Sequence, residues 1–435
     1  MEKLFHLKEH GTDVRTEIIA GATTFMTMAY ILAVNPAILS ACGMDFANVF
    51  TATALASAIA CFVMGFYANL PFALSAGMGL NAMFAYTVCL QMGYSWRWAL
   101  SAVLVEGLIF IALTVTNVRE AIINCIPSSL KKAISSGIGL FIAFVGLKNA
   151  GIIVADESNI TALNPTWYKG APLITLIGIV IMGVLLVKKV RGAVLLGILA
   201  ATVIGIPFGI TQYAGGSYIP PAPYFCEFAF SEIFADNESV TNFLFVVFTM
   251  LYFDIFDTVG TLIACSEKCG MIKEDGSIPS AKQALMADAI GTTAGAILGT
   301  STVTTFAETS SGVSEGGRTG LTAITVGALF LLSLFFEPIF GSIPSAATAP
   351  ALIIVGVMMF SPIKEMITDN FTEAIPFFLT IIMMVCSSSI SNGILFGVLS
   401  YVILKVLTGH GKEMSFMTYV VGALFILKVL AEIFV

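Results

Sequence analysis

Long apolar runs alternate with short polar segments along the whole chain. The runs are about 17–25 residues long, which is the length that a helix needs to cross the hydrocarbon core of a bilayer. They lack the strict apolar–polar alternation of outer-membrane strands, so the pattern predicts helical spans. The first half contains seven predicted spans, at Ile18–Leu39, Ala47–Tyr67, Phe72–Leu90, Trp98–Val115, Ala133–Leu147, Leu173–Val187 and Ala193–Ile210.

The second half repeats this number of spans. They are predicted at Asn242–Cys265, Ala284–Leu298, Gly299–Gly320, Leu321–Phe336, Ala346–Phe360, Ala374–Ser388 and Gly393–Leu407. A further apolar run, Met417–Phe434, is expected to be either a transmembrane or an interfacial helix. The predicted organisation is a cytoplasmic N-terminus (1–17), a first repeat (18–210), an acidic extracellular loop (211–239), a second repeat (240–407) and a C-terminal apolar helix (408–435).

The third span of each half is interrupted by polar residues. Phe72–Leu90 contains serine, glycines and Asn81, and Gly299–Gly320 is rich in Thr, Ser and Gly around Glu308. A helix that only fills hydrocarbon has no need of a carboxylate. Because seven is an odd number of spans, two equivalent halves must have opposite orientations. Inverted repeats with paired broken helices are the architecture of secondary transporters.

The distribution of charge predicts the orientation. If the N-terminus is cytoplasmic, most of the 20 Lys and Arg residues fall on the cytoplasmic side, as the positive-inside rule requires. The loop 211–239 has acidic residues but neither Lys nor Arg, and it then lies outside. We therefore expect a multi-pass protein of the plasma (inner) membrane.

Composition agrees with this class and excludes others. The chain is 57% hydrophobic and 11% charged, whereas soluble domains carry about 25% charged residues. No basic–aromatic patch indicates nucleic acid, and no phosphate loop indicates ATP. Cys265 and Cys269 have no nearby His or second Cys pair, so neither a metal site nor a cofactor is predicted.

Asp254 and Asp257 are three residues apart within an apolar span, so they share one helical face. Charged groups at mid-membrane are costly unless they are paired, hydrated or protonated. The pair is therefore expected to bind a solute and a proton. The alternative is a structural hydrogen bond to a neighbouring helix.

Glu308 lies in a segment that cannot form a continuous regular helix. Unwound backbone supplies free N–H groups, and half-helix N-termini add a positive potential. A carboxylate there can accept the N1–H and amino group of a base such as guanine, with Thr305 as a further polar group and Phe306 as a flat apolar wall. The alternatives are that Glu308 only caps a half-helix and that Phe306 only packs.

Asn81 is the first-half counterpart of Glu308, and its amide offers a donor and an acceptor together. Its alternative role is to satisfy the broken backbone. Thr24 is expected to face the same centre from the first span. Structural or supporting roles are expected for three further acidic residues, Glu106, Asp288 and Glu337.

The three histidines, His6, His10 and His410, lie outside the predicted spans. No intramembrane histidine can then relay protons, so coupling is expected to use carboxylates, namely Asp257, Glu308 and Asp254. No histidine or lysine is placed in the spans to activate a nucleophile, and no G-x-S-x-G elbow occurs. The chain is therefore not expected to be an enzyme.

Three motifs resemble those of the xanthine/uracil permease family of nucleobase–cation symporters. They are GATTFMTMAYILAVNP (Gly21–Pro36), FDIFDTVGTL (Phe253–Leu262) and GTSTVTTFAETSSGVSEGGRTGL (Gly299–Leu321). The motifs are most similar to the adenine–guanine–hypoxanthine permease branch, and the resemblance extends to about Leu407. It implies a fourteen-span inverted repeat with a core domain (spans 1–4 and 8–11), a gate domain (spans 5–7 and 12–14) and short strands in spans 3 and 10.

The resemblance also implies site residues, because Asp254, Asp257, Glu308 and Asn81 match positions of the branch's binding and transport residues. One departure concerns the coupling route. Uracil-type members carry Glu-His-x-Gly-His in span 8, where this chain reads DTVGT from Asp257 to Thr261. A histidine-linked proton route therefore does not carry over to this chain.

The expected function is import of purine bases in symport with protons, by movement of the core against the gate. Guanine and hypoxanthine are the first candidates, and adenine, sodium coupling and a homodimer stay open. One alternative is a carrier of xanthine, uracil, urate or sulfate; another is a channel or a sensor. An anion carrier should have a basic residue at the broken helices, and none occurs between Ala294 and Ser314.

Overall fold

The computed structural model describes a largely helical chain whose membrane-crossing elements match the predicted spans. Eight helices in the described part are long and apolar enough to cross a membrane, and three shorter apolar helices accompany them. Most of the predicted run Met417–Phe434 lies outside the described residues. These are residues 2–116, 128–156, 160–213, 215, 218–235, 237–269, 271, 278, 280–366, 369–414, 418–419, 422–423 and 425–426.

The first repeat follows a short N-terminal helix, α1 (Glu2–Phe5). Its spans are formed by α2 (Val14–Met28) with α3 (Ile31–Ser40), α4 (Phe46–Val63) with the π-helix η1 (Met64–Ala68), β1 (Leu74–Ala76) with α5 (Met78–Ala82) and η2 (Met83–Gln91), α6 (Trp96–Thr116), α8 (Ser128–Asn149), α9 (Gly170–Val187) and α10 (Ala193–Gly205). A small antiparallel hairpin, β2 (Ile153–Asp156) and β3 (Ile160–Leu163), lies between α8 and α9.

The second repeat is preceded by the short helix α11 (Phe230–Ile233). It comprises α12 (Asn237–Cys269), α13 (Ala281–Leu298), β4 (Val303–Thr305) with α14 (Thr309–Ser314), α15 (Gly320–Ser333) with η3 (Leu334–Phe336), α16 (Glu337–Phe340), α17 (Ser345–Phe360) with η4 (Ser361–Glu365), α18 (Phe371–Cys386), α19 (Ile390–Leu407) and η5 (Gly411–Glu413). The fourteen-span prediction is thus confirmed, and the residue boundaries of the larger regions stay predictions.

Two spans differ in detail from the hydropathy pattern. The first span is two helices rather than one, because α2 ends at Met28 and α3 begins at Ile31. The seventh span ends at Gly205, short of the predicted Ile210. Pro207 lies two residues further on and has no N–H to continue the helical hydrogen-bond series, and residues 206–209 form turns.

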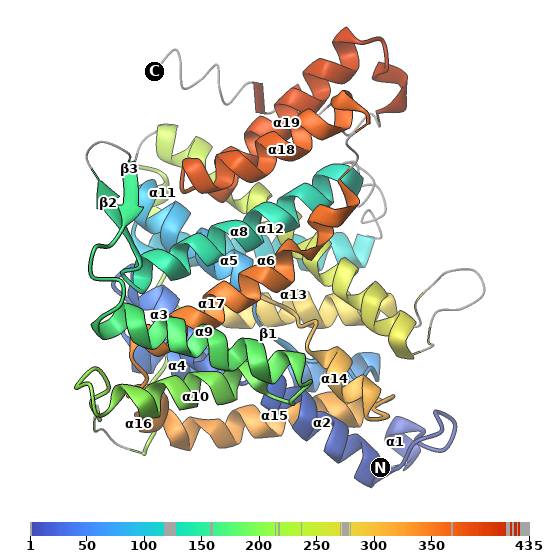
Figure 1. The fold of residues 1–435 in the computed structure, drawn as a ribbon. Coiled ribbons are helices and arrows are strands. Elements are labelled where there is room, and N and C mark those ends of the chain that lie inside the picture. Colours follow the sequence, from blue (N-terminus) through green and yellow to red (C-terminus); the bar gives the residue numbers. More distant parts are fainter. Residues whose placement is uncertain are drawn as a thin grey trace.

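The two broken spans meet through a pair of short strands. β1 and β4 are antiparallel, with Leu74 opposite Thr305 and Ala76 opposite Val303. Backbone N–H and C=O groups in a membrane must find partners within the protein. The strand pair satisfies these groups where both helices are interrupted, and it joins the two repeats at the centre of the molecule (Figure 1).

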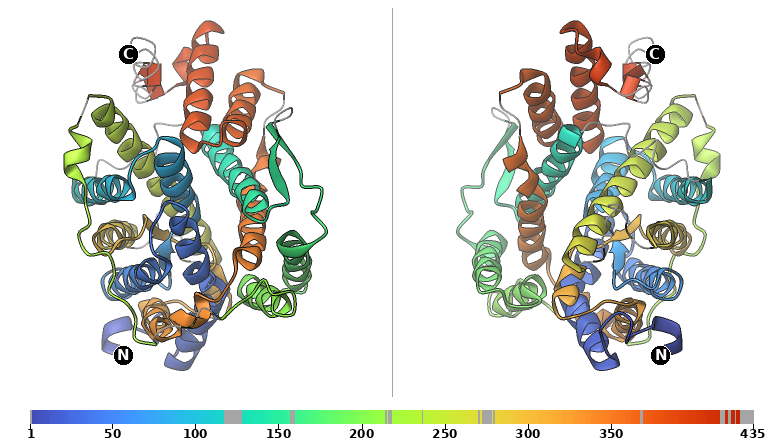
Figure 2. Two further views of the ribbon diagram at one scale, coloured as in Figure 1. Left: turned by 90° about the vertical axis from the view of Figure 1, so that its left-hand side faces the viewer. Right: turned by 90° about the vertical axis from the view of Figure 1, so that its right-hand side faces the viewer.

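The helices form two groups that lie side by side (Figure 2). In the core, α13 packs on α4 and α6, and α15 packs on α2 and α4. In the gate, α17 packs on α8, α9 and α10, and α18 packs on α8 and α19. This division is the core and gate arrangement that the family resemblance implies.

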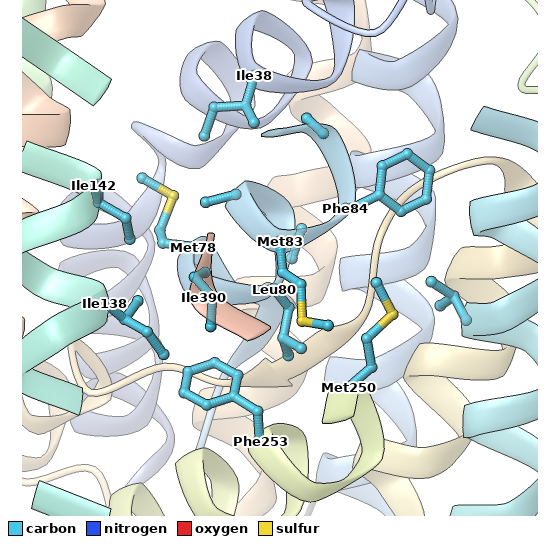
Figure 3. Packing of buried hydrophobic residues seen from close by; sticks show 14 of the residues in the cluster. Ile38, Met78, Leu80, Met83, Phe84, Ile138, Ile142, Met250, Phe253 and Ile390 are labelled. Carbon is cyan, nitrogen blue, oxygen red and sulfur yellow. The ribbon is translucent and has the colours of Figure 1, made fainter. Parts of the chain in front are cut away.

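Core and gate meet across an apolar layer, seen in Figure 3. Ile138 of α8 lies near Phe253 of α12 and Leu80 of α5. Gly79 is tightly enclosed there, because an added Cβ would lie 2.8 Å from the Phe253 ring and 3.1 Å from Ile138. A side chain at this position would therefore displace the Phe253 ring of α12 and press on Ile138 of α8.

Candidate substrate-binding site

A cavity of about 450 Å³ lies where the two broken spans face the gate. This volume is within the range that small-molecule sites occupy. Most of the lining comes from the core, and α17 of the gate closes one side with Val355, Met358 and Met359. The core contributes Tyr30, Gly77, Met78, Gly79, Asp257, Thr261, Thr304, Thr305, Phe306, Ala307, Glu308, Ser310 and Ser311.

The wall of the cavity is built by the β1–β4 pair and its extensions. The Gly77 N–H donates to Thr302 O at 3.0 Å, and the Phe306 N–H donates to Ala73 O at 2.9 Å. These bonds continue the pairing past both ends of β4. Thr305 and Phe306, both predicted as site residues, therefore line the cavity from a fixed backbone.

Glu308 lies at the start of α14 and lines the cavity. Its side chain makes no capping hydrogen bond to α14. Instead, the Tyr30 hydroxyl donates to Glu308 Oε1 at 2.7 Å. The capping alternative for Glu308 is therefore not what the structure shows, because the carboxylate is held from α2–α3 rather than by its own helix.

The two aspartates of α12 occupy different surroundings. Asp257 lines the cavity and accepts a hydrogen bond from Thr304 Oγ1 at 3.1 Å. Asp254 is fully buried and is not among the lining residues, and neither of its carboxyl oxygens has a hydrogen-bond partner in the described chain. One helical turn thus separates a carboxylate in the cavity wall from one behind it.

Asn81 and Thr24 also lie behind the wall. The Ser301 hydroxyl donates to Asn81 Oδ1, which ties span 3 to the segment before β4. Thr24 is fully buried on α2, where it faces Gly312 of α14. The structure therefore places both residues where they support the elements that carry the cavity, not among its lining residues.

Several lining residues were not predicted from the sequence. Tyr30 stands out, because it is the residue that holds Glu308. The available signal was a phenol within an apolar span, six residues before Pro36 and inside a motif already singled out. Ser310 and Ser311 likewise belong to the polar stretch around Glu308.

The lining is acidic and partly aromatic. Asp257 and Glu308 are its charged members, and the described lining includes no Lys, Arg or His. Carboxylates accept hydrogen bonds and cannot donate them when ionised, so they select a ligand that presents N–H groups. An anion would meet two like charges here without a compensating cation.

A cavity that lies beside paired broken spans, between two groups of helices, is where secondary transporters bind their substrates. The family model that matches residues 15–396 is described as the permease family. The chain belongs to this permease family, which confirms the resemblance seen in its motifs and makes it a transporter rather than an enzyme.

Two curated relatives extend over almost the whole chain. The guanine/hypoxanthine permease PbuG of Bacillus subtilis is 44% identical and matches over 98% of this chain and 99% of its own length. The adenine permease AdeQ of Escherichia coli is 42% identical, over 99% of this chain and 96% of its own length. Their names place both relatives among the carriers of purine bases.

A solved structure supports the fold alone. The transmembrane domain of the cyanobacterial bicarbonate transporter BicA superposes with a TM-score of 0.66 at 16% sequence identity. The match covers 88% of this chain and 97% of that domain. At this identity the match shows a shared inverted-repeat architecture and carries no information about the substrate.

Proposed function

We propose that this permease imports purine bases across the plasma (inner) membrane in symport with protons. The observation that carries the proposal is the carboxylate of Glu308, held by Tyr30 at the edge of a cavity that also contains Asp257 and Phe306. The sequence similarity to relatives named for adenine, guanine and hypoxanthine supports the substrate class.

The lining provides for both the edge and the face of a purine. Glu308 can accept from ring and exocyclic N–H groups, and the Thr305 hydroxyl, which has no partner in the described chain, can donate to a ring nitrogen or a carbonyl. Phe306 offers a flat apolar surface on which a base can stack. The lack of a basic side chain in the described lining disfavours sulfate and the urate anion.

Guanine and hypoxanthine remain the first candidates. Both present an N1–H that an ionised Glu308 can accept, whereas adenine presents an unprotonated N1 that needs a donor. A protonated Glu308 would supply that donor. Sequence identity does not decide the preference, because the relatives named for adenine and for guanine and hypoxanthine are 42% and 44% identical.

Coupling is proposed to use a proton carried on the acidic residues of the broken-span region, Asp254, Asp257 and Glu308. Protonation from outside would complete the site for the base, and release inside would weaken base binding. The proposed orientation has the N-terminus inside, and the excess of Lys and Arg that this puts on the cytoplasmic side supports it.

The test is uptake of radiolabelled hypoxanthine into proteoliposomes containing the purified protein. Competition by adenine, guanine, hypoxanthine, xanthine, uracil and urate ranks the substrates, and a protonophore tests the coupling. Counterflow of labelled hypoxanthine against an internal purine distinguishes a carrier from a channel. Inhibition by uracil or urate but by no purine would refute the substrate class.

The site assignment is tested with Glu308→Gln, which keeps the size of the side chain but removes its charge. We expect hypoxanthine uptake to fall by about tenfold or more, since a hydrogen bond to a charged group contributes roughly 1.5–3 kcal/mol. The control is Glu337→Gln at the start of α16, outside the cavity lining. Full uptake by Glu308→Gln, or an equal loss in the control, would remove Glu308 from the site.

A further inference from the structure

Three carboxyl groups lie together behind the cavity wall. Glu106 comes from α6, Asp254 from α12 and Asp288 from α13, helices that pack against one another in the core. All three side chains are fully buried. Asp254 is within electrostatic range of Glu106 and Asp288, and Asp288 is within range of Glu106. We refer to these three residues as the carboxyl cluster.

Most oxygen atoms of the carboxyl cluster have no hydrogen-bond partner. Both oxygens of Asp254, Oε1 of Glu106 and Oδ1 of Asp288 lack one in the described chain. The remaining oxygens accept one bond each, from Thr302 to Glu106 and from Thr258 to Asp288, both at 2.9 Å. Buried acids that repel one another and lack donors cannot all be ionised.

Glu17 shows what a structural buried carboxylate looks like in the same molecule. It is also fully buried, but it accepts from the backbone N–H groups of Arg318 at 2.8 Å and Thr322 at 3.1 Å. The Thr322 hydroxyl adds a further bond at 2.6 Å. Glu17 therefore has a full set of donors at the start of α15, whereas the carboxyl cluster has no comparable set among the described residues.

The described basic side chains of α6 and α13 have partners other than the cluster. Arg97, at the start of α6, pairs with Glu227 at 2.9 Å. Lys282, at the start of α13, donates to Val115 O at 3.3 Å. The charged group that does act on the cluster is Asp257, which is within electrostatic range of Asp254 and Asp288 and lines the cavity.

We infer that the carboxyl cluster of Glu106, Asp254 and Asp288 holds the coupling proton, behind the wall of the purine cavity. The inference rests on the proposed function and revises the place of its proton: Asp254 is kept, and Glu106 and Asp288 replace Asp257 and Glu308 as the groups that share it. A proton from water adds to one carboxylate oxygen, and the new O–H donates to a neighbouring carboxylate. Its release restores the carboxylate.

Strand β4 connects the cluster to the cavity. Thr302, just before β4, donates to Glu106, and Thr304 within β4 donates to Asp257 at 3.1 Å. Between them, Val303 O accepts from Thr292 of α13 at 2.9 Å. A change of charge in the cluster alters the acceptors that hold this strand, and β4 forms the cavity wall. Proton binding and base binding are then coupled, and the coupling acts equally in both directions.

The test compares proton-driven uptake with exchange in proteoliposomes, using labelled hypoxanthine and the variant Glu106→Gln. One coupled proton supports up to about tenfold accumulation per pH unit. We expect this accumulation in the wild type and its loss in Glu106→Gln, with exchange at equal pH continuing. Asp288→Asn is the second variant, and Glu337→Gln is the matched control that keeps accumulation. Accumulation retained in both cluster variants would overturn the inference.

Infrared spectroscopy tests the same inference without any substitution in the carboxyl cluster. Infrared difference spectra on adding hypoxanthine should show a change in the protonated-carboxyl band that persists in Asp257→Asn and Glu308→Gln. Loss of the band in either cavity variant with base still bound would place the proton in the cavity instead. Accumulation driven by sodium at constant pH would also refute the inference. A wild type that exchanges no purine would refute the proposed function itself, which separates the two failures.

Discussion

At the scale of single residues, the site depends on which of several buried acids face the cavity. The acids Asp254, Asp257 and Glu308 could all be found from the sequence, because a carboxylate within an apolar span is rare and costly. Their division into cavity and interior could not, since a spacing of three residues fixes a helical face but not what lies opposite it. Tyr30 was missed for the related reason that its partner is 278 residues away.

Tyr30→Phe tests the hydrogen bond that holds Glu308. The change removes the hydroxyl that donates to Glu308 Oε1 and keeps the ring. Because this donor orients the carboxylate, we expect base affinity to fall by about tenfold, or roughly 1.4 kcal/mol, close to the lower end of what a hydrogen bond to a charged group contributes. The measurement is the Kd for hypoxanthine by calorimetry with the detergent-solubilised protein.

Tyr94→Phe is the matched control for Tyr30→Phe. Tyr94 accepts a hydrogen bond from Asn242 at 3.0 Å and stacks on Trp98, outside the cavity lining. The same deletion of a phenolic oxygen should leave base affinity unchanged there. Equal affinities of Tyr30→Phe and the wild type would show that Tyr30 does not position Glu308.

At the scale of elements, hydropathy located the broken spans well but not their internal structure. Hydroxyls and glycines in Gly299–Gly320 exclude a regular helix, and the strands in spans 3 and 10 were implied by the family resemblance. The register of β1 on β4 depends on a partner more than 220 residues away, which local patterns do not contain. The break between α2 and α3 was hidden, because neither glycine nor proline marks it at Ala29 and Tyr30.

Gly312→Ala tests how α14 is positioned. An added Cβ at Gly312 would lie 2.5 Å from Ala20 O of α2 and would also clash with Thr24 Oγ1. We expect α14 to be displaced and Glu308 with it, so that uptake is largely lost and stability falls by about 1–3 kcal/mol, as overpacking usually costs. Uptake in proteoliposomes and the melting temperature in detergent measure the two effects.

Gly183→Ala provides the control for this overpacking. Gly183 lies in α9, where an added Cβ would meet nothing within 4 Å. The substitution should preserve uptake and leave stability unchanged or slightly raised, because alanine favours a helix more than glycine does. If Gly312→Ala behaves like Gly183→Ala, close approach of α14 to α2 is not required.

At the scale of the whole molecule, transport requires the core to move against the gate. The apolar layer of Ile138, Leu80 and Phe253 joins the two without directional bonds, which allows them to separate or slide (Figure 3). Polar contacts across the boundary are therefore the ones that favour one arrangement over another. Arg191, between α9 and α10 of the gate, pairs with Glu315 at the end of α14 in the core.

Reversing either charge tests whether this ion pair stabilises the arrangement of core and gate in the structure. Arg191→Glu or Glu315→Arg places like charges opposite each other. An exposed pair contributes about 0–1 kcal/mol, so we expect the exchange rate to change by up to about fivefold and less at high salt, where screening is stronger. The double reversal should recover the wild-type rate.

Arg97→Glu, which breaks a similar pair that does not involve the gate, should have no such effect. A double reversal that fails to recover exchange, or an equal change from Arg97→Glu, would show that the Arg191–Glu315 pair does not control the movement.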